Sequence, residues 1–218
     1  MTEERANDFV LDLISQHVLE FGQFTLKSGR QSPFFFNLGA IDLGDGLRRL
    51  GAAYAEKLRV LEYSFDVVFG PAYKGIPIAV STSIAMAEAG QRVGVAYNRK
   101  ESKQHGEGGL LVGAPLSERR VVIVDDVITA GTAVAESASL IQEAGGVLVG
   151  VLVALDRQEF VEDRSLTAVE SVSEELSVPV ESIASLSDVV RCVQNDPECR
   201  DTYRELANYQ RSHCQVAE

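Results

Sequence analysis

The chain has 218 residues, of which 20 are basic and 32 acidic, so its formal charge is −12, and 45% of its residues are hydrophobic. That apolar fraction is typical of a globular protein and excludes a disordered chain. The acidic balance argues against a nucleic-acid-binding surface, and no apolar run approaches the roughly 18 residues of a membrane span. We therefore expect one domain of ordinary size, without a nucleic-acid or membrane partner.

The first residues and the cysteines favour a cytoplasmic location. Three acids and one base stand within the first eight residues, whereas a secretory signal needs a basic start followed by an apolar block. The three cysteines, Cys192, Cys199 and Cys214, form an odd, sparse set without zinc spacing. They are therefore expected to be reduced thiols rather than a disulfide framework.

The first part of the chain predicts two helices separated by extended segments. Apolar residues follow helical spacing from Phe9 to Phe21, with Asn7 or Asp8 as the expected cap and Gly22 as the expected stop. This places His17 on an amphipathic helix, in a structural role. The elements predicted next are extended segments at 24–27 and 33–37 and a helix from about 46 to 61.

The middle of the chain alternates β-branched apolar runs with helical patterns. Apolar runs stand at 65–69, 92–97, 120–124 and 147–155, and the helical stretches between them at 76–89 and 132–144. The more polar last third predicts a strand at 180–183 and helices near 187–193 and 197–212. Continuous apolar strands separated by helices indicate an α/β fold whose central, mainly parallel sheet is flanked by helices.

Ligands of such sheets bind beyond the carboxyl ends of the strands, and the exit of 120–124 is the most informative one. A helix opens there directly after the strand, so free N–H groups and the positive helix end meet the hydroxyls of Thr129 and Thr132. This pattern predicts a phosphate cradle. Asp125 and Asp126 precede it and suit sugar hydroxyls or a divalent cation. The alternative is an ordinary strand–turn–helix with a threonine cap and surface aspartates.

Two other exits suggest further anion contacts. Lys74 lies in a Gly/Pro turn that could wrap an anion, although a plain surface turn is the alternative; Ile76 and Pro77 rule out a P-loop. The long segment 98–109 has a glycine-rich end and suggests a mobile lid for a pyrophosphate leaving group, with a solvated hairpin as the alternative. The cationic or potentially cationic residues of this segment are Arg99, Lys100, Lys103 and His105.

Residues 121–132, Val-Val-Ile-Val-Asp-Asp-Val-Ile-Thr-Ala-Gly-Thr, resemble the phosphoribosyl-pyrophosphate (PRPP) motif of the type I phosphoribosyltransferases. Segments 24–37, 69–77 and 98–109 further resemble the orotate phosphoribosyltransferase family, and Asp156-Arg157-Gln158 fits as well. The similarity runs from about residue 8 to the last helix, but beyond about residue 160 only in general character.

The resemblance implies a single domain over 1–218 with a small amino-terminal hood. The hood would cover the base with about 1–40, the PRPP-binding core would span about 45–160, and a strand and helices would fill about 160–218. The implied reaction is Mg²⁺-dependent transfer of the 5-phosphoribosyl group from PRPP to orotate, giving orotidine 5′-phosphate and pyrophosphate in pyrimidine biosynthesis. A homodimer with shared active sites is implied too, with Mg²⁺ bound mainly through substrate oxygens and no protein metal ligands.

The resemblance also implies a role for each site residue. Those expected to act catalytically are Lys103, His105, Asp125 and Asp126. The residues expected around the phosphoribosyl group are Asp125, Asp126, Val127, Ile128, Thr129, Ala130, Gly131, Thr132 and Ala133. The pyrophosphate contacts would be Tyr73, Lys74, Arg99, Lys100, Lys103 and His105. Orotate would be held by Lys27, Phe35, Phe36, Thr129 and Arg157. A cis peptide bond is expected at Ala72–Tyr73.

Elementary chemistry supports the orotate assignment, because a planar anionic pyrimidine needs an aromatic face and a fork for its carboxylate. Phe35 or Phe36 can supply the first and Arg157 the second. Two alternatives stay open: a phosphoribosyltransferase for another base, and a non-catalytic regulator that kept the fold to sense nucleotides. The charge of −12 and the lack of an added domain disfavour the regulator.

Overall fold

The computed structural model describes residues 3–26, 29–103, 109–161, 165–194 and 196–215, with only the backbone at 102 and 103. Its centre is a six-stranded sheet in which β5 runs antiparallel to β4 and the other strand pairs are parallel. The strands in spatial order are β5 (Gly109–Gly113), β4 (Gly94–Lys103), β3 (Val67–Gly70), β6 (Arg120–Val127), β7 (Val147–Asp156) and β8 (Val180–Ser185).

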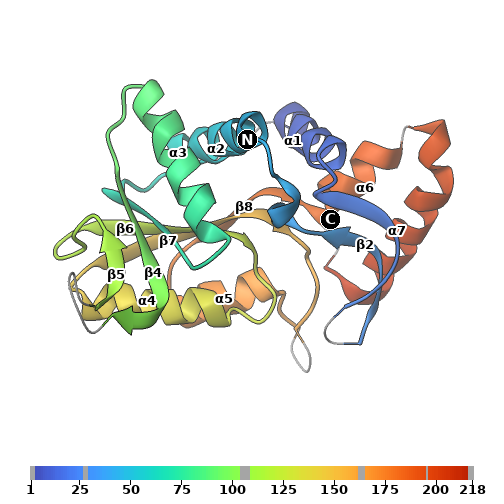
Figure 1. The fold of residues 1–218 in the computed structure, drawn as a ribbon. Helices are drawn as coiled ribbons and strands as arrows, with labels where there is room; N and C mark the ends of the chain where they lie inside the picture. The colour runs from blue at the N-terminus through green and yellow to red at the C-terminus, as the bar shows by residue number, and fades with distance from the viewer. Residues whose placement is uncertain (1–2, 27–28, 104–108, 162–164, 195, 216–218) are drawn as a thin grey trace.

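Helices cover both faces of this sheet (Figure 1). Successive residues of a strand point to opposite faces, so Val122 of β6 packs into the same core as Leu50, whereas Ile123 packs with Ile141 on the other side. The helices on the first side include α2 (Gly44–Arg59) and α3 (Gly75–Glu88); those on the second are α4 (Thr132–Glu143) and α5 (Ala168–Leu176). The predicted α/β architecture is confirmed.

A second, two-stranded sheet brings the two ends of the chain together. It consists of the antiparallel strands β1 (Leu19–Thr25) and β2 (Gln31–Phe36). The helices α1 (Glu3–Ser15) and α6 (Leu186–Gln194) pack on each other, and β2 packs on α7 (Arg200–His213). Figure 1 shows this group at one end of the central sheet. Two 3₁₀ turns, Leu38–Ala40 and Pro197–Cys199, complete the described elements, and no described helix is long and apolar enough to cross a bilayer.

The predicted boundaries of the first helix are wrong at both ends. The helix α1 begins at Glu3, ahead of the expected cap at Asn7 or Asp8, and it ends at Ser15. His17 adopts a left-handed φ of 54° in the turn that follows, so it does not lie on the helix. Val18 and Leu19 are buried, but β1 rather than the helix carries the chain onward. Gly22 marks the irregularity in the β1–β2 pairing instead of a helix stop.

The segment 98–109 is also shorter as a loop than predicted. The strand β4 continues through Lys103, which pairs with Gly109 of β5, so Arg99, Lys100 and Lys103 belong to a strand. The antiparallel pairing with β5 satisfies backbone groups that a loop would leave to water. Arg99, Lys100 and Lys103 therefore stand on one arm of a β-hairpin at the sheet edge.

Candidate active site

The turn between β3 and α3 is built by close backbone contacts. A Cβ atom on Gly70 would stand 2.1 Å from the carbonyl oxygen of Gly75, so only glycine fits there. The Ala72–Tyr73 peptide bond is cis, as the resemblance implied. The backbone N–H of Ala72 donates to Oδ1 of Asn98 over 2.9 Å. The turn is thus tied to β4 and held at the carboxyl ends of neighbouring strands.

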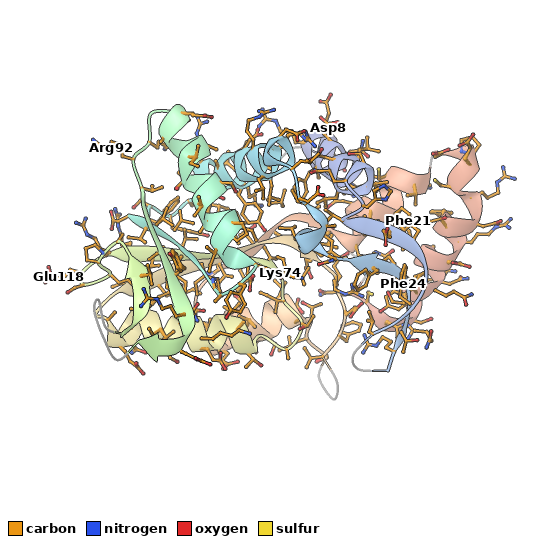
Figure 2. All side chains as sticks on the ribbon, in the orientation of Figure 1. Asp8, Phe21, Phe24, Lys74, Arg92 and Glu118 are labelled. Carbon is orange, nitrogen blue, oxygen red and sulfur yellow. The ribbon has the colours of Figure 1, made fainter. Side chains whose placement is uncertain are left out.

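Lys74 and the two aspartates of β6 meet at this edge. The ammonium Nζ of Lys74, which stands at the start of α3 (Figure 2), donates to Oδ2 of Asp126 over 2.6 Å. Asp125 and Asp126 are 8% and 7% exposed. Burial, reinforced by the negative charge of Asp126, raises the pKa of Asp125 to about 7. A neutral or half-ionised Asp125 can both donate and accept a hydrogen bond, as contact with a sugar hydroxyl requires.

The start of α4 has the features of an anion site. Gly131 precedes the helix with a left-handed φ of 74° and, having no side chain, makes no cap hydrogen bond to the first N–H groups. Thr129, Ala130, Thr132 and Ala133 are exposed around these donors, whereas the side chain of Ile128 is buried. Uncapped N–H groups at a helix start attract oxyanions through hydrogen bonds and the helix dipole. Val127 and Ile128 can contribute there through their backbone.

The hairpin arm reaches the β3–α3 turn through one pair of side chains. Nζ of Lys100 lies 5.0 Å from the ring centroid of Tyr73, a cation–π contact. Tyr73 is 66% exposed, so a ligand can reach both groups. Arg99 is half-buried on the same strand. The structure thereby brings Tyr73 and Lys100 together beside Lys74, the residue that follows Tyr73 in the chain.

Arg157, directly after β7, is buried and fixed in a second cluster. Its Nη2 and Nε donate to Oε1 of Glu159 over 2.6 and 2.9 Å, and its guanidinium carbon lies 4.2 Å from the ring centroid of Phe34. The sequence reasoning singled out neither Glu159 nor Phe34. The period-two alternation of β2 could have found Phe34, because it shares a strand face with Phe36.

The two phenylalanines predicted to hold orotate have different environments. Phe36 is buried in the core on the face it shares with Phe34, whereas Phe35 is 40% exposed on the opposite face. The ring of Phe35 stacks on Phe24 with centroids 5.4 Å apart. Of the three rings at 34–36, Phe34 is therefore the one in contact with Arg157.

Two predicted site residues, Lys27 and His105, lie outside the described residues, and so does the side chain of Lys103. The described part of the chain gathers no group of three or more His, Cys, Asp or Glu side chains that could hold a metal ion. Asp125 and Asp126 form a pair of carboxylates at the strand exit, and Lys74 already neutralises one of them.

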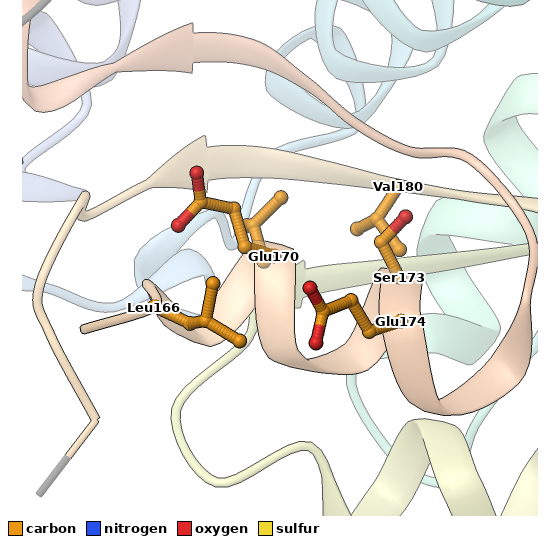
Figure 3. A pocket seen from close by; sticks show the side chains of 6 residues that line it. Leu166, Glu170, Ser173, Glu174 and Val180 are labelled. Atoms are coloured by element: carbon orange, nitrogen blue, oxygen red, sulfur yellow. The ribbon is translucent and has the colours of Figure 1, made fainter. Parts of the chain in front are cut away.

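Two cavities lie apart from the residues predicted to hold the phosphates. One, of about 270 Å³, is lined by α5 and its flanks and includes Leu166, Glu170 and Val180 (Figure 3). The other, of about 480 Å³, lies between the β1–β2 hairpin and α7 and includes Ser32 and Tyr209. Neither is lined by a predicted site residue. The candidate site is instead an open edge where β3, β4, β6 and β7 end.

Comparison with known proteins decides the family. The phosphoribosyl transferase domain matches residues 42–185. Orotate phosphoribosyltransferase of Pseudomonas aeruginosa is 52% identical over 194 residues, covering 88% of this chain and 90% of the relative. That of Legionella pneumophila (strain Paris) is 50% identical over 206 residues, covering 94% and 95%. The chain belongs to the orotate phosphoribosyltransferase family.

Solved structures agree with this membership. The crystal structure of orotate phosphoribosyltransferase from Francisella tularensis matches with a TM-score of 0.85 and 32% identity, covering 95% of this chain and all of that one. The Mycobacterium tuberculosis enzyme in complex with PRPP shares the fold, with a TM-score of 0.64 and 22% identity over 85% of this chain and 98% of that one. The predicted membership in the orotate phosphoribosyltransferase family is thereby confirmed.

Proposed function

We propose that this protein transfers the 5-phosphoribosyl group of PRPP to orotate, giving orotidine 5′-phosphate and pyrophosphate in pyrimidine biosynthesis. The observation that carries the proposal is the strand-exit edge itself. An uncapped helix start, the Lys74–Asp126 pair and the Lys100–Tyr73 pair stand on neighbouring strands of a chain about 50% identical to orotate phosphoribosyltransferases over most of its length. Anion-binding groups at two ends of one edge suit a sugar that bears phosphates at both ends.

The 5′-phosphate is held at the start of α4, by the backbone of 127–133 and the hydroxyls of Thr129 and Thr132. Asp125 and Asp126 take the ribose hydroxyls. On the other side, Tyr73 and Lys74 contact the pyrophosphate, together with Arg99, Lys100, Lys103 and His105. The division follows charge, because the carboxylates would repel a phosphate but accept hydrogen bonds from hydroxyls.

In the reaction, N1 of orotate attacks the anomeric carbon as pyrophosphate leaves from the opposite face, so the configuration inverts. The transition state is oxocarbenium-like and needs no protein nucleophile. The cations of the hairpin and the turn stabilise the charge that develops on the departing pyrophosphate, and the helix start fixes the sugar's far end. The hairpin must also exclude water, since an exposed oxocarbenium would be hydrolysed.

Mg²⁺ is the proposed cofactor, and the residues present fit it. Two carboxylates at the ribose position, without a third ligand among the described residues, suit an ion held mainly through substrate oxygens. When bound, the ion would supply positive charge that offsets the charge of the pyrophosphate. Asp125 and Asp126 are the residues that would approach it.

We further propose that the base site consists of Arg157, Phe34 to Phe36, Thr129 and Lys27, covered by a hood of about residues 1–40. The core at about 45–160 would bind PRPP, and the remainder would support the hood within a single domain. A cytoplasmic homodimer with shared active sites completes the proposal. The cysteine content supports the cytoplasmic location. The family supports the base site, the hood and the homodimer.

The test is a base panel. Purified protein with Mg²⁺ and PRPP is mixed with orotate, uracil, adenine or hypoxanthine, and pyrophosphate release and base absorbance are followed. Only orotate is expected to be consumed. Consumption of another base instead would indicate a different phosphoribosyltransferase, and calorimetric binding of PRPP without any pyrophosphate release would indicate a regulator.

A further inference from the structure

One carboxylate behind Arg157 gathers donors from three separate segments of the chain. Oε1 of Glu159 accepts hydrogen bonds from Arg157 and, over 2.6 Å, from the hydroxyl of Tyr209 on α7. Oε2 of Glu159 lies 3.4 Å from Nη1 of Arg30, in the turn between β1 and β2. The exit of β7, the β1–β2 hairpin and the last helix therefore meet at Glu159.

Aromatic packing holds the same groups in place. Phe34 presents its ring to the guanidinium of Arg157 and meets the Tyr209 ring edge-on, with centroids 6.0 Å apart and planes at 89°. Tyr209 in turn stacks on His213, with centroids 4.7 Å apart. A tyrosine held on two sides keeps its hydroxyl aimed at Glu159, so the acceptor of Arg157 is itself held.

The hydrogen bonds leave one edge of the guanidinium for a ligand. Glu159 accepts hydrogen bonds from Nε and Nη2 of Arg157, and Oγ of Ser32 lies 3.4 Å from Nη2. Nη1 makes no hydrogen bond to another described residue, so it is the edge that remains for a ligand. Arg30, Arg157 and Glu159 together carry one net positive charge, which one carboxylate would neutralise.

The hydroxyl of Tyr209 is a lasting donor in this cluster. Burial, followed by the hydrogen bond to Glu159, raises the pKa of Tyr209, so the phenol stays protonated at neutral pH. By donating this hydrogen bond, the neutral O–H stabilises the carboxylate form of Glu159. The ionised Glu159 in turn keeps Arg157 in one orientation.

We propose that Tyr209 and Glu159 are positioning residues for the base: Tyr209 holds Glu159, and Glu159 holds the guanidinium of Arg157 against Phe34 so that Nη1 meets the carboxylate of orotate. The inference rests on the proposed function, because it requires a base that carries a carboxylate. It assigns to the last helix, where the sequence resemblance is weakest, a part in selecting the substrate.

The experiment compares Tyr209→Phe with Tyr203→Phe, which removes a hydroxyl from a half-buried tyrosine of the same helix. Loss of one hydrogen bond to a charged group is expected to raise the KM for orotate about five- to tenfold in Tyr209→Phe. The KM for PRPP should stay within about twofold, since the side chain of Tyr209 contacts, among the described residues, Phe34, Glu159 and His213. Tyr203→Phe should leave both constants unchanged, and Arg157→Ala should show the largest increase for orotate.

Glu159→Gln provides a second route to the same answer, because it keeps the shape of the side chain and removes its charge. It should raise the KM for orotate at least as much as Tyr209→Phe does, and thermal unfolding followed by circular dichroism checks that each variant is folded. An unchanged KM for orotate in folded Tyr209→Phe, or equal increases for orotate and PRPP, would overturn the inference. If the wild-type protein consumes orotate, such a result leaves the proposed function standing; if the wild type consumes none, it is the function that fails.

Discussion

Asp125 is a carboxyl group that folding places in an unfavourable environment. Its side chain is buried next to the second carboxylate, Asp126. The hydroxyl of the buried Tyr54 donates to the backbone carbonyl of Asp125 over 2.7 Å. Because its pKa is raised to about 7 from an ordinary 3.8, the folded protein binds a proton that the unfolded chain releases near pH 4. Its contribution to stability is therefore complete below pH 4 and is lost as pH rises to about 7.

The free energy of unfolding is expected to reflect this titration. Between pH 5.5 and 7, Asp125 should remove on the order of 2 kcal/mol of stability in the wild type, and Asp125→Asn should abolish that loss. Urea unfolding at half-unit pH steps measures it. The control is Asp201→Asn, whose carboxylate is 93% exposed. Parallel pH profiles of wild type and Asp125→Asn would contradict the assignment of the raised pKa.

Lys103 is the last residue of β4 and, with Lys74 and Lys100, one of the three lysines proposed to contact the pyrophosphate. Lys103→Ala should lower kcat on the order of 100-fold, because a cation that stabilises the leaving group acts most strongly in the transition state. Steady-state kinetics at saturating PRPP and orotate measures the change. Arg92→Ala is the control, since it removes an exposed cation just before the other end of β4. An unchanged kcat in Lys103→Ala would remove the hairpin from the chemistry.

Among the elements, the start of α4 depends on a single glycine. Gly131 has a left-handed φ, and a Cβ atom there would stand 2.5 Å from Cγ2 of Val172 on α5. Gly90 after α3 has a similar φ of 81° but open space around it, so Gly90→Ala carries the backbone cost without the clash. Comparing the alanine variants at Gly131 and Gly90 therefore separates the cost of backbone strain, which both carry, from the effect of the clash with Val172.

Gly131→Ala is expected to lose more stability than Gly90→Ala, by about 1–2 kcal/mol, and to raise the KM for PRPP at least tenfold. Adding Val172→Ala should restore part of both losses. Chemical unfolding and initial-rate kinetics give the two numbers. A normal KM for PRPP in Gly131→Ala would place the 5′-phosphate away from the start of α4.

The elements that could be predicted from the sequence are those whose apolar pattern has only one structural interpretation. The buried strands β3, β6 and β7 carry nearly continuous apolar runs, and the helices between them carry apolar residues at helical spacing. The order of these elements alone locates the strand-exit edge. The end of α1 could not be predicted, because Val18 and Phe21 continue the helical spacing by coincidence and His17 takes a conformation that usually indicates glycine. The extension of β4 beyond residue 97 was missed because residues 98–103 are polar, and β5 was missed because it has only three apolar residues between two glycines.

Local signals were present for one missed element. Thr167 and Glu170 form a capping box at the start of α5, a pattern legible in the sequence as Thr-x-x-Glu. At the site, the exits predicted Asp125, Asp126 and Lys74 as neighbours, and the structure joins Lys74 to Asp126. The sequence could not indicate Glu159 and Tyr209 as partners. Their hydrogen bond joins residues 50 positions apart and depends on how α7 docks.

At the scale of the whole molecule, the proposed homodimer makes a quantitative prediction. Sedimentation should give a mass of twice 23.6 kDa, and mixing two inactive variants should restore activity if each site uses Lys103 of the partner subunit. Lys103→Ala mixed with Asp126→Asn should then recover about a quarter of wild-type activity, because half of the dimers are hybrids with one intact site. Unmixed variants at the same total concentration are the control, and no recovery after verified exchange would mean that each site is made from one chain.

The docking of α7 against β2 has a consequence for biosynthesis. Translation completes residues 127–133, the proposed phosphate loop, 76 residues before it reaches Tyr209. A nascent chain could therefore form the proposed PRPP cradle while α7 is still in the exit tunnel, so the proposed selection of the base would begin only after α7 has docked.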